Sequence, residues 1–159
     1  MNRIVSNMDV GESEVLGAVK KLQEARKDAE RKIRDLTERL LVYEADELSA
    51  QIQLVSDIPL LTKIFTDRDA EAIRLLAQQL ISRHHCVALL GGGVGKMQLV
   101  FARSEELRQP MGTLMQNTMK QIGGRGGGRP EIAMGGAPDL ETVKQAIAWA
   151  KEEIVKNSV

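Results

Sequence analysis

The chain has 159 residues with 22 basic and 22 acidic side chains, which fits one domain or a small domain plus an extension. The balanced charge gives no overall field toward nucleic acid or membrane, although a neutral total can hide a basic face. A single cysteine, Cys86, excludes an internal disulfide and a multi-cysteine zinc site, and it agrees with a reducing, cytoplasmic location. No apolar run approaches the roughly 20 residues of a membrane span, so we expect no membrane partner.

The first third of the chain predicts a long helix. Residues 12–51 contain no proline, are dense in charge, and repeat apolar residues at 4-3 spacing with one interruption at Arg26. This pattern is typical of a coiled coil or helical hairpin. We expect residues 1–51 to be a helical dimerisation segment, because so long an amphipathic helix needs a partner surface; a helix lying on its own domain is the alternative. The expected homodimer seam comprises Val15, Val19, Leu22, Ile33, Leu36 and Leu40.

The remainder, residues 52–159, alternates between strand and helix patterns. The predicted elements are a strand over 52–58 ending at Pro59, a helix from a cap at Asp67 through Arg83, a strand over 86–90, a turn over 91–95, a strand over 97–102, a helix over 111–122, a strand over 130–136, and a helix capped by Asp139. Met111, Met115 and Met119 recur at helical spacing and are expected in the core. The fold class is therefore α/β (α+β): a long amino-terminal helix or coiled coil, then a small mixed sheet of three to four strands covered by helices.

Two segments are similar to functional motifs but do not match them. Residues 91–96, GGGVGK, resemble a phosphate-binding P-loop, yet Leu90 and Met97 stand where that motif needs glycine and Ser or Thr. A hairpin turn with an exposed lysine explains the segment better. His84, His85 and Cys86 are adjacent, so their side chains diverge and do not easily share one zinc ion.

We find no complete catalytic set in the sequence. Ser104-Glu105-Glu106 is interpreted as a helix N-cap rather than a catalytic group. No Ser-Asp pair has a histidine placed as its base. We therefore expect a chain with no catalytic residues, no metal site and no cofactor.

The densest glycine run lies at residues 123–130, GGRGGGRP. Consecutive glycines can present backbone N–H groups to an anion, and arginine forks suit phosphate groups. Residues 107–130 also contain no acidic side chain. We interpret the run as an anion-contacting loop; a tight turn, a flexible tether, or arginines paired with carboxylates of the same domain are the alternatives. The predicted nucleic-acid contacts are Lys96, Lys120, Gly123, Gly124, Arg125, Gly126, Gly127, Gly128 and Arg129.

Residues 123–136, GGRGGGRPEIAMGG, resemble the signature of the DHH-associated domain at the C-terminus of alanyl-tRNA synthetases and long-form alanyl-tRNA editing proteins. Residues 95–100 and 114–122 fit the same domain in the same order, and the charged helix before Ala50 resembles the helical part that precedes it. The chain departs from the family at Met134, often Gln, and at residues 135–137, often Ala-Gly-Gly. The resemblance implies a tRNA-binding, dimerising C-terminal (C-Ala) module, non-catalytic by itself, whose partner is tRNA for alanine.

Two other hypotheses remain. The same domain follows phosphoesterase domains that cut cyclic dinucleotides or short oligonucleotides, so the chain could be the substrate-binding half of such an enzyme. That branch usually has histidine after the glycine triplet, whereas this chain has Arg129-Pro130, and its Asp-His-His metal motif is absent, as is the editing zinc motif. In the third hypothesis the chain is only an oligomerisation module and the glycines pack.

Overall fold

The computed structural model describes residues 2–158, and side chains from residue 11 onward. It has two compact units, a helical unit up to Leu40 and a globular unit from Leu41. Helix α1 (Asn2–Ser49) forms the described part of the helical unit, residues 2–40, and its last turns, from Leu41 to Ser49, belong to the globular unit. The domain boundary that the sequence predicts after residue 51 stays a prediction. No helix within residues 2–158 combines the length and apolarity that a membrane crossing requires.

The globular unit is built on a six-stranded mixed sheet with the order β1-β2-β3-β4-β6-β5. Strands β2 and β3 are parallel, and the other neighbouring pairs are antiparallel. The strands are β1 (Gln53–Val55), β2 (Ile58–Phe65), β3 (Val87–Gly92), β4 (Met97–Arg103), β5 (Gly126–Gly128) and β6 (Ile132–Ala137). The α/β class predicted from the sequence is confirmed, but the expected three to four strands were too few.

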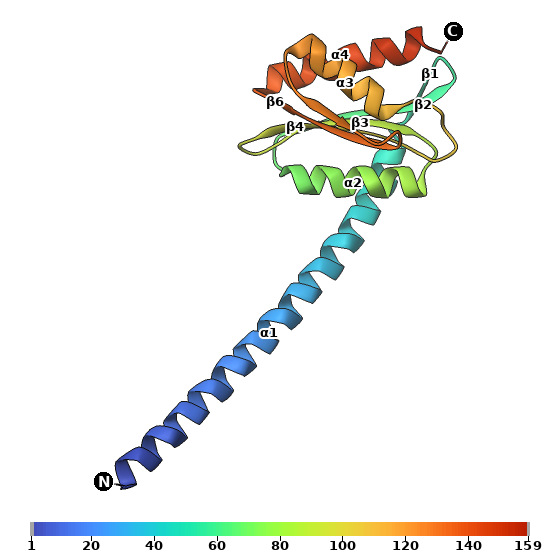
Figure 1. The fold of residues 1–159 in the computed structure, drawn as a ribbon. Helices are drawn as coiled ribbons and strands as arrows, with labels where there is room; N and C mark the ends of the chain where they lie inside the picture. Colours follow the sequence, from blue (N-terminus) through green and yellow to red (C-terminus); the bar gives the residue numbers. More distant parts are fainter. Residues whose placement is uncertain (1, 159) are drawn as a thin grey trace. The chain divides into compact units, whose positions relative to one another are not determined.

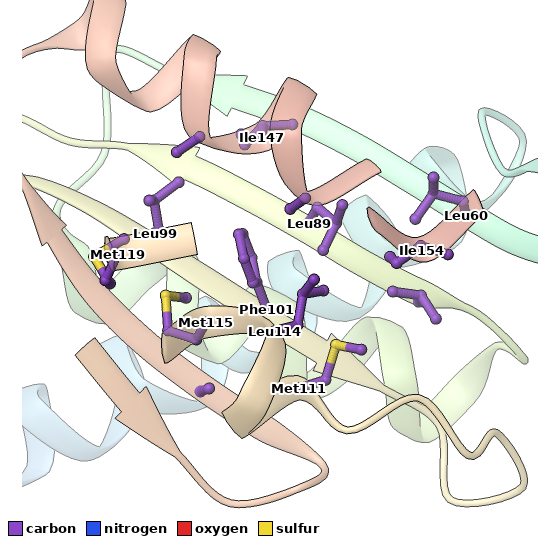
Figure 2. Close-up of a cluster of buried hydrophobic side chains, with 14 of the residues drawn as sticks. Leu60, Leu89, Leu99, Phe101, Met111, Leu114, Met115, Met119, Ile147 and Ile154 are labelled. Atoms are coloured by element: carbon purple, nitrogen blue, oxygen red, sulfur yellow. The ribbon is translucent and has the colours of Figure 1, made fainter. Parts of the chain in front are cut away.

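Helices cover both faces of the sheet (Figure 1). Helices α3 (Met111–Ile122) and α4 (Leu140–Lys156) lie on one face, and α2 (Ala70–Arg83) lies on the other. The first core, under α3 and α4, contains Phe101 and the predicted methionine stripe of α3, whose three side chains are buried (Figure 2). The second core, under α2, also buries Leu41, Ala45 and Leu48 from the end of α1. Each face of the sheet is thus packed within the globular unit.

The amino-terminal strands differ from their prediction. The single strand expected over 52–58 is a hairpin, β1–β2, whose turn residues Ser56 and Asp57 have φ of 49° and 65°. Pro59 lies inside β2 rather than ending a strand. Pairing of β2 with β3 begins only at Leu60, so the missing N–H of proline removes no bond from that ladder.

Two predicted caps were also wrong in position. Helix α2 is capped by Asp69, whose Oδ1 accepts a hydrogen bond from the Ala72 N–H at 2.8 Å, and not by Asp67. Ser104 caps no helix: its hydroxyl accepts from the Cys86 N–H at 2.8 Å and donates to the Cys86 carbonyl at 3.1 Å, joining two neighbouring strand ends. Asp139 does cap α4, as predicted, by accepting from the Thr142 N–H.

Candidate nucleic-acid interface

The glycine run forms an edge strand instead of a loop. Gly126, Gly127 and Gly128 make up β5 and pair with Gly135, Met134 and Ala133 of β6. Gly123 ends α3 in the left-handed conformation, with φ of 72°, which favours glycine. The chain therefore leaves α3, turns at once, and runs back as the outermost strand of the sheet.

Most glycines of the strand are required by close packing. A Cβ on Gly126 would lie 2.8 Å from the Gly135 Cα and 2.8 Å from the Met119 Cγ, and one on Gly128 would lie 2.5 Å from the Ile132 carbonyl oxygen. A Cβ on Gly127 would lie 3.6 Å from the nearest atom of Gln116, an ordinary contact. Composition alone does not distinguish these positions. Glycine is required at residues 126 and 128 because β5 approaches β6 and α3 closely there.

The backbone N–H groups of this segment are largely engaged inside the unit. Those of Gly123 and Gly124 donate to the Met119 carbonyl, the latter at 2.8 Å. The Arg129 N–H donates to the Ile132 carbonyl at 2.9 Å. Because antiparallel pairing alternates, Gly126 and Gly128 direct their N–H groups away from β6, toward the free edge. The consecutive N–H concavity expected from the sequence is not formed.

The four predicted basic contacts divide between the two ends of β5. Arg125 and Arg129 flank the strand, about 13 Å apart along an extended chain. Lys120 lies in the last turn of α3, close in sequence to Arg125. Lys96 immediately precedes β4, whose Gln98 pairs with Gly136 of β6, and the Gly136 N–H donates to the Arg125 carbonyl. Lys96, Lys120 and Arg125 thus lie at one end of the sheet, and Arg129 lies at the other.

These four side chains are exposed, and no ion pair formed among residues 11–158 includes any of them. The first two carboxylates that follow β5 in the sequence have other roles. Glu131 lies 3.7 Å from Arg103, and Asp139 caps α4, where the Thr142 N–H lowers its pKa. The positive charge along β5 is therefore not neutralised by contact with these carboxylates.

The segment that resembles a P-loop comprises the end of β3, Gly91 and Gly92, and the turn of the β3–β4 hairpin, residues 93–96. Gly92 and Gly93 have φ of 126° and 151°, and a Cβ on Gly92 would lie 1.8 Å from the Phe65 carbonyl oxygen. Lys96 ends this turn and leads into a strand, whereas a P-loop leads into a helix. The hairpin turn predicted here is confirmed, but it begins after Gly92 and not at Gly91, where a Cβ would lie 2.5 Å from the Val143 Cγ1 of α4.

The two histidines and the cysteine have separate surroundings. His84 and Arg83 both bind the carboxylate of Asp46, which lies near the end of α1, and the hydrogen bond from Arg83 is the main cause that lowers the Asp46 pKa. His85 contacts Glu106 at 2.6 Å. Cys86 is buried, and burial raises the pKa of its thiol to about 11. Within the described residues, no three His, Cys, Asp or Glu side chains are grouped to hold a metal ion.

A family model for the DHHA1 domain matches residues 57–156, most of the globular unit. The chain belongs to the DHHA1 domain family. It is similar to the alanine–tRNA ligase of Trichodesmium erythraeum (strain IMS101), with 31% identity over 142 residues that cover 86% of this chain and 16% of that protein. The alanine–tRNA ligase of Bordetella petrii (strain ATCC BAA-461 / DSM 12804 / CCUG 43448) is 30% identical over 142 residues, which cover 84% of this chain and 16% of that protein. The DHHA1 chain therefore spans about a sixth of the length of these curated relatives.

Among solved structures, the fold is similar to the C-Ala domain of alanyl-tRNA synthetase from Aquifex aeolicus. The TM-score is 0.60 with 26% identity, over 65% of this chain and 97% of that one. The resemblance stated from residues 123–136 is thus confirmed. The strand character of residues 126–128 was missed by sequence reasoning, because three glycines carry no strand propensity. The turn at Gly123 and the following β6 were the available signals.

Proposed function

We propose that the globular unit binds tRNA, with tRNA for alanine as its ligand, through the basic residues around β5, and that the helical unit joins two copies of the chain. The chain itself carries out no catalysis in this proposal. The single observation that supports it most is the set of exposed lysines and arginines along β5 that form no ion pair among residues 11–158. Similarity to alanine–tRNA ligases supports the choice of ligand.

The chemistry of β5 favours a backbone ligand over a base-reading one. Guanidinium groups bind phosphate oxygens in a bidentate fashion, and ammonium groups add point charges. The chain has only four aromatic residues, and none lies in the segment from residue 102 to residue 148, so stacking on bases has no platform here. Duplex RNA is recognised mostly by shape and by contacts to phosphates and 2′-hydroxyls. We therefore expect recognition of the shape and backbone of tRNA.

The edge strand contributes backbone donors to this interface. The N–H groups of Gly126 and Gly128 point away from β6 and are available to a phosphate, while the absence of a Cβ at these two residues serves the packing against β6 and α3. Arg125 and Arg129 then hold the backbone at two positions about 13 Å apart. Lys96 and Lys120 extend the positive surface beyond Arg125. All the basic residues predicted from the sequence thus remain in the proposed interface, with the arginines as its main members.

The test is a tRNA titration at several salt concentrations with the double variant Arg125→Ala, Arg129→Ala. Removing one phosphate-binding side chain should reduce the salt slope of binding by roughly one unit, with a similar decrease in affinity for different tRNAs. The matched control is Lys144→Ala, Lys156→Ala, which removes the same charge from α4, where both lysines already pair with glutamates. A salt slope unchanged in the arginine variant, with lowered thermal stability, would mean that the arginines serve only the fold.

A further inference from the structure

The apolar stripe of the helical unit follows a heptad pattern in which one position, Arg26, is charged. Its apolar side chains are largely exposed, for example Leu22 at 70% and Ile33 at 64%. Assigning Val19 and Ile33 to heptad position a, and Leu22 and Leu36 to position d, places Arg26 at an a position and Ala29 at a d position. Between residues 15 and 40, the outer positions b, c and f hold charged residues except at Gly17. The stripe is therefore a seam that needs another helix.

Arg26 is the residue that distinguishes the possible partners of this seam. In a parallel pair of identical helices each a position faces its own copy, so two Arg26 side chains would meet in the seam and two Ala29 side chains would leave a gap beside them. Within one helix Arg26 donates to Glu30 at 2.9 Å, and its side chain is 81% exposed. Two such ion pairs do not fill the gap at Ala29. A parallel pair thus has two adjacent poor layers.

An antiparallel pair of identical helices removes both defects in one register. If the two-fold axis passes midway between Lys27 and Asp28, each a or d residue faces the partner residue with which its number sums to 55. Arg26 then lies over the partner's Ala29, whose small side chain leaves room for the arginine stem. The remaining layers are wholly apolar: Val15 with the partner's Leu40, Val19 with the partner's Leu36, and Leu22 with the partner's Ile33.

The positions that flank the seam agree with this register. Across an antiparallel pair, e positions meet e positions and g positions meet g positions. Gln23 then faces the partner's Glu30, and Ala25 faces the partner's Lys32, so no like charges meet. The only oppositely charged g–e pair of the parallel arrangement, Arg39 with Glu44, needs a carboxylate that Arg68 already binds in the globular unit. Shifting the antiparallel register by one heptad leaves apolar layers unpaired at an end.

We propose that the helical unit pairs with a second copy of the chain as an antiparallel coiled coil centred between Lys27 and Asp28, with Arg26 over the partner's Ala29. This inference rests on the dimerisation in the proposed function and adds its orientation and register. The paired stretch, residues 15–40, is about 38 Å long. Arg26 acts as the orientation device: it is tolerated beside a small residue and disfavoured beside itself.

Cysteine cross-linking tests the orientation directly. In the proposed register Leu22→Cys and Ile33→Cys lie at the same level on opposite helices, whereas two copies of either variant hold their cysteines about 16 Å apart along the axis. An oxidised mixture of the two variants should form a disulfide-linked dimer, and each variant alone should not. If the helices pair in parallel, each variant alone should form a disulfide-linked dimer. The unaltered chain is the control, because its Cys86 is buried.

Sedimentation equilibrium on the same samples separates the two levels of the proposal. If the protein is a dimer but disulfides form only between two copies of the same variant, the proposed dimerisation stands and the antiparallel orientation is wrong. A monomer, or an assembly larger than a dimer, overturns both. A third variant, Arg26→Leu, should keep the dimer and allow self-cross-linking when combined with Leu22→Cys, because the barrier to the parallel arrangement is gone. No gain of self-cross-linking would contradict the role assigned to Arg26.

Discussion

The two units differ in whether their apolar side chains are buried within the unit. In the globular unit each face of the sheet is covered by helices, and Phe101 and Leu89 are wholly buried. In the helical unit Leu22 and Leu40 are 70% and 67% exposed. The globular unit therefore carries its stabilising contacts within itself, while a helix of this kind depends on packing against a partner for most of its stability. Substitutions in the two units should accordingly change different quantities.

The largest effect is expected in the core of the globular unit. Phe101→Ala removes a wholly buried ring under α3 and should lower the free energy of unfolding by about 3–5 kcal/mol. Leu36→Ala, in the exposed seam, should leave the unfolding of the globular unit unchanged. Urea titration followed by the signal of Trp149 measures both. Equal losses in the two variants would mean that the units do not differ in this way.

The next effect concerns association of the helical unit. Leu22→Asp with Leu36→Asp places carboxylates in the seam and should raise the dimer dissociation constant by at least about 100-fold, because burying each leucine is worth about 2 kcal/mol. Lys20→Asp with Arg34→Asp puts the same carboxylates outside the seam and should have a much smaller effect. Analytical ultracentrifugation over micromolar concentrations gives the comparison. If the seam variant dimerises like the parent, the apolar stripe is not the interface.

A smaller effect is expected at the glycine strand. Gly128→Ala sets a Cβ 2.5 Å from the Ile132 carbonyl oxygen and should lower the free energy of unfolding by about 1–3 kcal/mol, as overpacking does. Gly127→Ala meets only the Gln116 side chain, at 3.6 Å, and should be tolerated. Thermal unfolding of the pair decides. The two variants behaving alike would remove the packing explanation for β5.

The smallest effect is a pH dependence at the junction of α1 with α2. The Asp46 pKa is lowered from 3.8 by Arg83 and His84, so the folded state holds this carboxylate ionised more strongly than the unfolded state does. Its contribution to stability is present above pH 3.8 and is lost as the pH falls through the lower folded value. Asp46→Asn should therefore be less stable than the parent at pH 6, with the difference shrinking toward pH 3. Glu105→Gln, with no ion pair among the described residues, is the control; a constant difference across pH would contradict the assignment.

The elements that could be predicted from the sequence are those marked by a regular period of apolar residues or by local turn residues. Met111, Met115 and Met119 repeat at helical spacing and do pack in the core, and the β3–β4 hairpin follows from its apolar strands and glycine turn. The order of strands and helices also identified the fold class. These predictions succeed because the period of apolar residues and the local turn residues determine the element.

The elements that were missed are held by tertiary contacts. Strand β5 exists because Gly126 and Gly128 approach β6 closely, which depends on residues that follow them in the chain. Pro59 can enter β2 because ladder pairing with β3 begins one residue later. At the candidate site, the sequence supplied the basic residues, but their division between the two ends of β5 follows from strand pairing. The predicted RNA contacts themselves stay a prediction.

Strand β5 is also an edge of the sheet, with no strand paired on its outer side, and this bears on solubility. A bare edge of backbone N–H and C=O groups is a template on which another chain can add a strand. Three glycines offer no side chain to prevent this, but Arg125 and Arg129-Pro130 bracket them on both sides. Charge and proline beside an edge are the usual guards against sheet-to-sheet association. We therefore expect the arginines proposed to hold RNA to hinder the pairing of one molecule's sheet with the next as well, so that the Arg125→Ala, Arg129→Ala variant should aggregate more readily even without RNA.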